Sequence, residues 1–426
     1  MKTPPMMSRV PLWVLIFLLA ACSENPPESK EGDTSATVVS TDGNREEGGK
    51  PTASVTDPTP IPDDDLPTPV SAWSYHHLRG KIKDLAITME LCRLPAAYEA
   101  DGYRYQGYYR YDRVGGPIAV YGSVDSAGWL VLYETAQWQG GQPFFRGEWS
   151  ADEWRGKWTS GDGQRTYNFV LTKTESDGSL AFVTRSIMDT FLLKPQWSTS
   201  PQATYQIDWV EPQADSNALN RFLQREILRG LVGDSLANRH GSLEGALVAD
   251  KRAYFQEYRD EMIRLIKEGL IDTVDMDLFH SFSYEQTSAV FIYCNSPEIL
   301  TLGYQYYYFT GGAHGNYATS IVTYDLPARR VITLNEVLAP GFEPILSVAL
   351  EQAVRRKYGL TEQAPLSEVL FDDVIAPNEN FGLTEKGIFF VYPPYEIAPY
   401  AAGEIELYVP FTDIAQVVQP RWLERS

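Results

Sequence analysis

The chain has 426 residues, of which 43% are hydrophobic and 13% aromatic, and this leaves room for two or three folded domains. Its formal net charge of -20 argues against a nucleic-acid partner, because acidic surfaces repel phosphate groups. The same charge is compatible with plain solubility, or with a basic protein partner that is attracted electrostatically.

The first residues form a targeting segment. Lys2 and Arg9 form a positively charged region before an apolar stretch at residues 10–19, which is too short for a comfortable transmembrane helix. The sequence Leu-Ala-Ala-Cys, ending at Cys22, resembles a bacterial lipobox. We therefore expect a signal peptide at residues 1–21 and a lipid anchor, including palmitate, on Cys22. The alternative is a plain secretory signal with an accidental cysteine.

Residues 22–74 are rich in Pro, Ser, Thr, Asp, Glu and Gly, and such a segment cannot bury enough apolar surface to fold. We interpret it as a disordered tether between the lipid anchor and the folded part. By resemblance to other lipoproteins, Ser23 favours the outer membrane, so the expected location is the cell envelope, facing the periplasm. His76 and His77 follow the tether and are expected to be solvated, although adjacent imidazoles also bind metals adventitiously.

Residues 75–185 contain short strand-like runs at regular spacing, separated by turn signals such as Gly115-Gly116. This pattern predicts a small antiparallel all-β domain, either an open sheet or a barrel. One predicted strand covers residues 82–89. The runs at residues 145–149 and 154–158 share the order aromatic, Arg, Gly, charged, Trp, and we expect them to pair as neighbouring strands.

The aromatic residues of this domain have two interpretations. Exposed rings would stack on sugars, whereas buried rings would fill the interior of a small barrel, and we favour the second. The rings concerned are Tyr103, Tyr105, Trp129, Trp138, Trp149, Trp154 and Trp158.

Residues 186–295 are predicted to begin a second folded unit, in which strands alternate with amphipathic helices. Here apolar residues recur at helical spacing in two long stretches, each with a charged opposite face. The predicted elements are a strand at residues 205–210, a helix from a cap at Asp215 or Ser216 to Leu231, a helix at residues 243–269, and strands at residues 278–284 and 289–293.

Residues 296–417 are organised around a glycine-rich stretch, Thr-Gly-Gly-Ala-His-Gly-Asn at residues 310–316, which follows an aromatic strand at residues 304–309. Glycine tolerates positive φ, so this stretch predicts a tight hairpin loop. The further predicted elements are strands at residues 321–324 and 331–334, a helix at residues 343–358, a hairpin at residues 381–392 and a last strand at residues 404–409.

The predicted fold class is therefore α+β. A small antiparallel all-β domain is followed by an α+β domain, whose helices pack on a mostly antiparallel sheet. The second unit divides into residues 186–295 and residues 296–417.

The glycine-rich stretch also carries a family resemblance. The order aromatic strand, Thr-Gly-Gly-Ala-His-Gly-Asn, Tyr-Asp-Leu and Val-Ile-Thr-Leu-Asn-Glu-Val-Leu resembles the RsiV-like C-terminal domain, named after a lysozyme-sensing anti-sigma factor. The resemblance runs over about residues 195–414 and implies an extracytoplasmic binding or sensing domain with a lysozyme-like ligand. It does not imply an enzyme. RsiV has a transmembrane helix and a sigma-factor-binding segment, where this chain has a lipobox and a tether.

Cys92 and Cys294 lie in apolar, strand-like runs. An oxidising envelope would allow them to form a disulfide, but two buried free thiols fit the sequence equally well. The chain has no Cys-x-x-Cys motif, so nothing supports a structural zinc site or a thioredoxin-like site.

The sequence lacks the common catalytic signatures, namely Gly-x-Ser-x-Gly, His-Glu-x-x-His and the phosphate-binding P-loop. His314 has three candidate roles: holding the loop in shape, contacting a partner, or acting as a base or metal ligand beside Asp325, Glu336 or Glu404. We favour the first role. No catalytic residue, metal or cofactor is therefore expected.

We expect the protein to bind or sense an envelope ligand without catalysis, the ligand being a basic, lysozyme-like protein or a cell-wall glycan. The alternatives are an enzyme acting on peptidoglycan or another polysaccharide, and a structural lipoprotein of an envelope complex. The candidate binding residues lie around the glycine-rich loop and in an aromatic segment at residues 392–400; they are Tyr306, Tyr308, Thr310, His314, Asn316, Tyr392, Tyr395 and Tyr400.

Overall fold

The computed structural model describes residues 73–95, 102–135, 141–174, 178–196, 200–213, 217–240, 242–270 and 282–424. The predicted signal peptide, Cys22 and nearly all of the predicted tether lie outside these residues. Within the described part, none of the helices combines the length and the hydropathy needed to cross a membrane.

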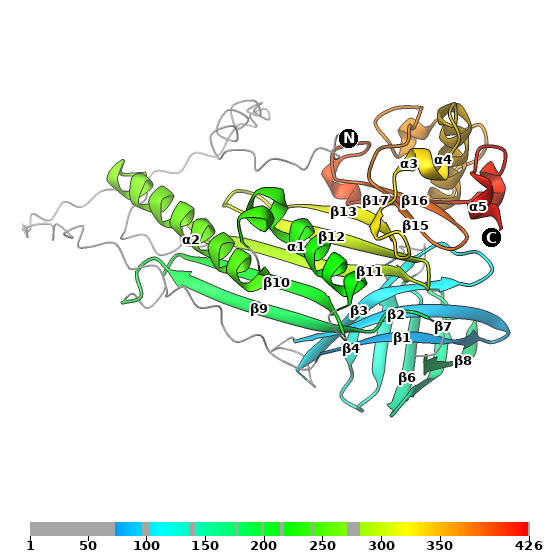
Figure 1. Ribbon diagram of the computed structural model, residues 1–426, viewed down its shortest axis with the longest axis horizontal. Helices are drawn as coiled ribbons and strands as arrows, with labels where there is room; N and C mark the ends of the chain where they lie inside the picture. Colours follow the sequence, from blue (N-terminus) through cyan, green and yellow to red (C-terminus); the bar gives the residue numbers. More distant parts are fainter. Residues whose placement is uncertain are drawn as a thin grey trace, which may run out of the picture. The chain divides into compact units, whose positions relative to one another are not determined.

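Eight antiparallel strands at the start of the described chain form a barrel (Figure 1). Each strand pairs with the next one in sequence, and the first also pairs with the eighth, which closes the barrel. The predicted all-β domain is confirmed, and the closure selects the barrel over the open sheet. The strands are β1 (Trp73–Ile82), β2 (Leu85–Pro95), β3 (Tyr103–Tyr111), β4 (Ile118–Val124), β5 (Leu130–Glu134), β6 (Phe144–Ser150), β7 (Glu153–Thr159) and β8 (Thr166–Lys173).

Aromatic side chains fill the inside of the barrel. Phe145, Trp154 and Phe169 are at most 1% exposed, and their ring centroids lie between 4.6 and 5.7 Å apart. The predicted interior role is thus confirmed for Trp154. Trp129 is instead 39% exposed and stacks under the guanidinium group of Arg146.

The two related runs of the barrel are neighbouring strands, as predicted. In the pairing of β6 with β7, Phe145 lies opposite Trp158, and Gly147 lies opposite Gly156. A Cβ atom at Gly156 would come within 2.5 Å of the Gly147 Cα atom, so the two backbones approach each other more closely than larger residues would allow.

Two predictions near the start of the barrel are wrong. The run at residues 82–89 is not one strand, because β1 and β2 form a hairpin in which Ile82 pairs with Leu85 across a turn where Lys83 has φ 54°. His76 and His77 are not solvated beside a tether but belong to β1. His77 is 5% exposed, and its Nδ1 atom lies 2.8 Å from a carboxylate oxygen of Glu90.

A second run of strands follows the barrel and is mostly antiparallel, as predicted. It comprises β9 (Phe182–Leu192), β10 (Gln202–Pro212), β11 (Tyr284–Asn295), β12 (Ile299–Phe309), β13 (Asn316–Asp325) and β14 (Arg330–Val331). Only β10 and β11 pair in parallel, since the chain crosses over through two helices between them. A short pairing of β9 with β1 joins this sheet to the barrel. The predicted strand at residues 278–284 lies largely outside the described residues, and β11 begins at Tyr284.

The crossover helices, α1 (Ala218–Arg239) and α2 (Leu243–Lys267), lie across one face of this sheet (Figure 1). Leu223 and Phe255 from the helices pack with Leu302 from β12 in one buried core. The predicted helices are confirmed, but the cap of α1 is Asn217, whose side chain accepts a hydrogen bond from the Asn220 N–H at 2.8 Å. The expected caps, Asp215 and Ser216, lie outside the described residues.

A second, three-stranded sheet packs on the opposite face of β12 and β13. It contains β15 (Phe381–Leu383), β16 (Gly387–Tyr392) and β17 (Ile405–Pro410), and α4 (Glu343–Tyr358) packs on its far side. The Thr301 hydroxyl donates to Leu383 O at 2.7 Å, and Leu383 N–H donates to the Thr323 hydroxyl at 3.0 Å. The predicted hairpin, helix and last strand of this region are confirmed.

The predicted strand at residues 331–334 is wrong. Strand β14 ends at Val331, and a short helix, α3 (Leu334–Val337), begins three residues later. The reason is a capping box, in which a Glu336 carboxylate oxygen accepts hydrogen bonds from the N–H and the hydroxyl of Thr333, both at 2.9 Å.

A buried polar network connects the barrel to the sheet. The carboxylate of Glu90 on β2 accepts hydrogen bonds from the hydroxyl of Tyr75 at 2.6 Å, from Arg110 Nη1 at 3.0 Å and from the backbone N–H of Asn295 at 3.3 Å. It also lies beside His77. Tyr75, His77 and Arg110 belong to the barrel, whereas Asn295 ends β11, so one carboxylate ties the two parts together.

The same region contains the two cysteines of the described part. Cys92 and Cys294 are both buried and both free. Burial raises the pKa of each thiol to about 12, so neither is a thiolate at neutral pH.

Candidate functional site

The glycine-rich stretch forms the loop between β12 and β13. Tyr308 pairs with Asn316 at the ends of the two strands, and the chain turns between them. Gly311 and Gly312 have φ values of 87° and 95°, which side-chain-bearing residues rarely adopt. The predicted hairpin loop is therefore confirmed.

His314 lies in this loop and contacts a distant segment of the chain. Its ring stacks on the ring of Tyr400, with centroids 3.9 Å apart and planes 21° apart. The Tyr400 hydroxyl donates to Gly315 O at 2.6 Å, and His314 Nδ1 lies 2.9 Å from the same oxygen. Both rings thus hold the loop against the segment that follows β16.

Two further tyrosines complete an aromatic surface around Tyr400. The centroid of Tyr395 lies 5.6 Å from that of Tyr400, and the centroid of Tyr317, on β13, lies 6.1 Å from it. We call His314, Tyr317, Tyr395 and Tyr400 the loop cluster. The loop cluster joins the glycine-rich loop to the aromatic segment at residues 392–400, which the sequence had indicated as two separate candidate binding segments.

Tyr395 has an unusual backbone. Its φ angle is 70°, in the left-handed region, although a bulky residue is disfavoured there. Its side chain is nevertheless 58% exposed, so no buried packing of the ring accounts for this conformation. Backbone strain of this kind costs on the order of 1–3 kcal/mol and concentrates at functional sites.

Several of the predicted site residues lie elsewhere. Tyr392 is 1% exposed, belongs to the core beneath α4 and donates its hydroxyl proton to Ala376 O at 2.8 Å. Tyr306 packs against the core under α1 and α2, and Tyr308 follows it on the same face because side chains alternate along a strand. That face is opposite to the one that carries the second sheet. Thr310 and Asn316 are half-buried residues at the two ends of the loop.

Glu404 supports the loop cluster, a role that the sequence did not indicate. Its carboxylate accepts hydrogen bonds from the backbone N–H of Thr319 at 2.5 Å and from the Thr319 hydroxyl at 2.8 Å. Burial raises the pKa of Glu404, although both donors oppose the shift. The sequence had named Glu404 as a partner for His314, but it binds the strand after the loop instead.

His314 has no carboxylate hydrogen-bonded to its ring in the part of the chain that the structure describes. Asp325 accepts from Ala328 N–H, and Glu336 belongs to the capping box of α3. Among the same described residues, no group of three or more His, Cys, Asp or Glu side chains is arranged to hold a metal ion. The loop cluster is a group of stacked aromatic rings in which the His314 Nδ1 atom lies beside a backbone carbonyl oxygen.

A second feature lies beside β17, at the edge of the three-stranded sheet. A pocket of about 430 Å³ opens between β17, the end of α4 and the turn after β3. We call it the edge pocket. Its lining residues are Val114, Ala353, Arg356, Lys357, Glu406, Leu407, Tyr408, Pro410 and Asp413.

Glu406 is the central ionisable group of the edge pocket. Burial raises its pKa to about 7; Lys357 opposes this shift, and Glu404 adds to it. Within the described residues, no hydrogen bond or salt bridge reaches its carboxylate. The turn after β3 covers one end of the pocket, where the Tyr408 hydroxyl donates to Val114 O at 2.7 Å.

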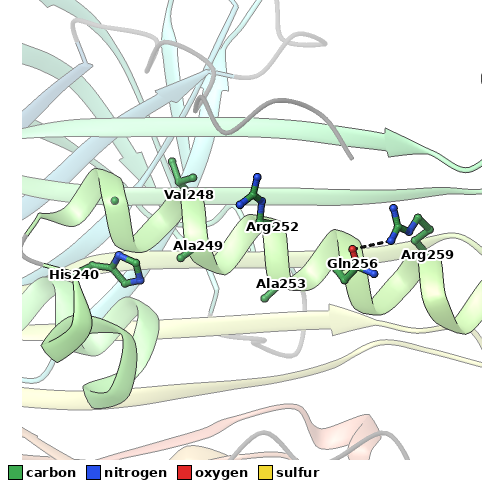
Figure 2. Close-up of a pocket in the computed structure, with 8 residues that line it drawn as sticks. His240, Val248, Ala249, Arg252, Ala253, Gln256 and Arg259 are labelled. Carbon is green, nitrogen blue, oxygen red and sulfur yellow. Dashed lines mark hydrogen bonds between the residues drawn. The ribbon is translucent and has the colours of Figure 1, made fainter. Parts of the chain in front are cut away.

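A larger groove, of about 680 Å³, runs along α2 and contains none of the predicted site residues (Figure 2). Gly245, Ala249 and Ala253 line it at helical spacing, together with Arg252 and Arg259. Apart from His240, which caps the C-terminal end of α1, all the lining residues belong to α2. One helix face with small side chains makes a shallow surface, so we attach no function to this groove.

Part of the fold is similar to that of a solved protein from the DUF3298 family. A DUF3298-family protein from Bacteroides fragilis is 23% identical to this chain with a TM-score of 0.51, and the match covers 59% of this chain and 98% of that one. A DUF3298-family protein from Pseudomonas aeruginosa is 20% identical with a TM-score of 0.39, covering 58% of this chain and 97% of that one.

The family itself is matched in the C-terminal part of the chain. The sequence model described as "Protein of unknown function (DUF3298)" matches residues 335–412, so the chain contains a DUF3298 domain there. These residues include α4, the second sheet, Tyr395, Tyr400 and most of the edge pocket, whereas His314 precedes them. The narrower resemblance to RsiV is not confirmed by these matches. No curated protein matches the chain.

Proposed function

We propose that this chain is a non-enzymatic binding protein of the bacterial cell envelope, anchored by a lipid on Cys22, whose loop cluster contacts a cell-wall glycan. The signal-like first residues, the lipobox and the tether composition support the location. The loop cluster supports the activity, because it gathers aromatic rings at a surface, and no carboxylate of the described residues is hydrogen-bonded to His314.

The observation that carries the proposal is Tyr395. It keeps a left-handed backbone, at φ 70°, and a largely exposed ring beside Tyr400. A fold that needed only a turn at this position would be more stable with glycine. Glu396 N–H donates to Pro393 O at 3.1 Å, so Tyr395 lies in a turn, and the retention of an exposed tyrosine there supports a ligand that covers its ring.

A glycan suits the chemistry of this surface. The apolar face of a sugar ring packs on an aromatic face, while tyrosine hydroxyls and carboxylates bind the sugar hydroxyls. The carboxylate of Glu396 is adjacent to Tyr395, and Asn378 Nδ2 donates to it at 3.1 and 3.2 Å. Asn378 Nδ2 also donates to Val391 O at 3.0 Å, so it holds the carboxylate in place, and Glu396 supplies an acceptor beside the rings.

Isothermal titration with soluble, peptide-free wall glycan fragments tests this activity, on the chain from residue 22 onward with Cys22→Ser. We expect saturable binding that Tyr400→Ala weakens by at least about tenfold, as for a central aromatic contact. The matched control is Tyr308→Ala, because Tyr308 is 43% exposed but lies on the opposite face of the sheet. Equal binding by the two variants would exclude the loop cluster as the site.

The net charge of -20 favours a second candidate ligand, a basic lysozyme-like protein. Electrostatic complementarity of that kind gives binding that weakens steeply with salt, whereas stacking on a glycan depends little on salt. Titration with a basic lysozyme at low and high ionic strength therefore separates the two ligands. Release of the chain from membranes by Cys22→Ser is the test of the proposed anchor.

A further inference from the structure

The edge pocket contains a strand with an unpaired edge. In the sheet order β15, β16, β17, the last strand has a neighbour on one side only. Just after β17, Phe411 N–H donates to Lys386 O at 2.9 Å. Hydrogen-bonded and non-bonded pairs alternate along an antiparallel ladder, so Val409, Leu407 and Ile405 are the residues that bond to β16.

The backbone groups of Glu406 and Tyr408 therefore point away from β16 and toward the pocket. Together they offer two N–H donors and two C=O acceptors to an incoming chain. Pro410 occupies the next outward position and has no N–H, so it ends the available edge. The turn at Val114 closes the same end through the Tyr408 hydroxyl. The free edge is thus short.

The charges around this edge are of both signs. Glu406 points from β17 into the pocket, while Arg356 and Lys357 stand in the last turn of α4. The neighbouring Arg355 is bound to Glu351 at 2.7 Å and to the carbonyl groups of Thr361 and Ala364. By contrast, no hydrogen bond or salt bridge reaches Arg356 or Lys357 within the described residues. The pocket therefore offers a carboxylate that can bind a cationic group and two basic side chains that can bind an anionic group.

From this geometry we infer that the edge pocket binds a short extended peptide, which adds as a strand to β17 and carries one cationic group and one carboxylate. The peptide backbone pairs with Glu406 and Tyr408, its cation meets the Glu406 carboxylate, and its carboxylate meets Arg356 and Lys357. Its remaining surface packs on Val114, which lines the pocket and is 53% exposed. This mode of recognition is strand addition, in which the backbone supplies affinity and the side chains supply specificity.

The inference is independent of the proposed glycan site. The edge pocket and the loop cluster have no residue in common, so loss of one ligand does not predict loss of the other. Tyr400→Ala is expected to leave peptide binding unchanged.

The experiment uses the chain from residue 22 onward with Cys22→Ser, and the probe is the tripeptide N-acetyl-Ala-Lys-Ala with a free carboxylate. Three modified probes replace the lysine by norleucine, amidate the carboxylate, or methylate a backbone nitrogen. We expect saturable binding of the parent probe by titration calorimetry. The backbone-methylated probe should bind at least about tenfold more weakly, because methylation removes a ladder hydrogen bond and adds a clash.

Two variants assign the charges by double-mutant cycles. Glu406→Gln should weaken binding of the parent probe by about tenfold but leave binding of the norleucine probe unchanged. Lys357→Met should likewise weaken binding of the parent probe, which has a free carboxylate, but leave binding of the amidated probe unchanged. Glu343→Gln, at the exposed start of α4, is the matched control for folding and net charge. Any of three results would overturn the inference: no binding of the parent probe at millimolar concentration, equal binding of the methylated probe, or equal effects of Glu406→Gln and Glu343→Gln.

Discussion

The carboxylate of Glu404 accepts two hydrogen bonds from Thr319, one from its backbone N–H at 2.5 Å and one from its hydroxyl at 2.8 Å. This contact joins the start of β17 to β13 and so fixes the segment that carries Tyr400 beside the glycine-rich loop.

Thr319→Val tests the contribution of that contact. Valine keeps the shape of the side chain but removes the donor to a charged acceptor, so we expect the free energy of unfolding to fall by about 1.5–3 kcal/mol. Urea unfolding measures this change. The control is Thr287→Val on β11, since Thr287 bonds to Glu285 at the surface and should change stability by less than about 0.5 kcal/mol. Similar losses in both variants would contradict a special role for Thr319.

Glu406 gives stability a defined dependence on pH. Its pKa in the folded chain is about 7, above the ordinary value of 4.5, so it ionises less readily when folded than when unfolded. Below pH 4.5 Glu406 is protonated in both the folded and the unfolded chain, so it does not change the free energy of unfolding. Between pH 4.5 and about pH 7 it ionises only in the unfolded chain, and the free energy of unfolding falls as the pH rises. Above about pH 7 it ionises in both states, and the loss is complete. The charged groups that line the pocket or act on Glu406 are Arg356, Lys357, Glu404 and Asp413. Burial raises the pKa of the surrounding tyrosines, so they stay neutral in this range; they are Tyr108, Tyr293 and Tyr408.

Glu406→Gln removes this ionisation. The variant should be more stable than the parent by roughly 3 kcal/mol at about pH 8, and the difference should vanish below about pH 4.5. Urea unfolding across this range provides the measurement, with Glu343→Gln as the exposed control. A difference that does not change with pH would mean that Glu406 ionises normally.

Tyr395→Gly separates stability from binding. Glycine adopts φ 70° without strain, so the variant should gain about 1 kcal/mol of stability over Tyr395→Ala, which keeps the strain. Both variants should lose the glycan affinity of the parent chain, because both lose the ring. Thermal unfolding and calorimetric titration of the three proteins measure the two effects. Retained affinity in either variant would remove Tyr395 from the proposed site.

Arg110→Met tests the buried network between the barrel and the sheet. Burial alone would raise the pKa of Glu90, but the charges of His77 and Arg110 and the hydrogen bonds to this carboxylate lower it overall. Loss of Arg110 leaves a buried carboxylate poorly compensated, so we expect a loss of about 3–5 kcal/mol at neutral pH. Arg185→Met is the control, because its pair with Glu211 is about one-third exposed on both sides and should contribute about 0–1 kcal/mol.

The elements with strong local signals were predictable from the sequence. The alternation in the barrel, the paired Trp-containing runs, the amphipathic helices and the glycine-rich loop all depend on neighbouring residues, and each of these predictions is confirmed. The failures occurred where a short polar signal decided the structure, as in the capping box of Thr333 and Glu336, or the turn at Lys83 inside an apolar run.

The candidate site was only partly predictable because its contacts are distant in sequence. His314 and Tyr400 were both named, but their stacking depends on how β13 and β17 meet in space. Tyr392 resembled its neighbours in sequence, yet it ends β16, a strand whose residues are all buried. The edge pocket left no local signal, since Glu406, Lys357 and Val114 come from three separate elements.

Strand β1 pairs with β2, with β8 and, at its start, with β9. During synthesis it is made first, but two of its three partners are made only after the rest of the barrel. The chain between β1 and β8 loses conformational entropy when its ends meet, before the pairings of β1 with β8 and β9 add any stability. The pairing of β1 with β8 is therefore a slow step of folding. Until then β1 has an open edge that can pair with another molecule. Chains truncated before β8 should therefore aggregate through the strand that closes the mature barrel.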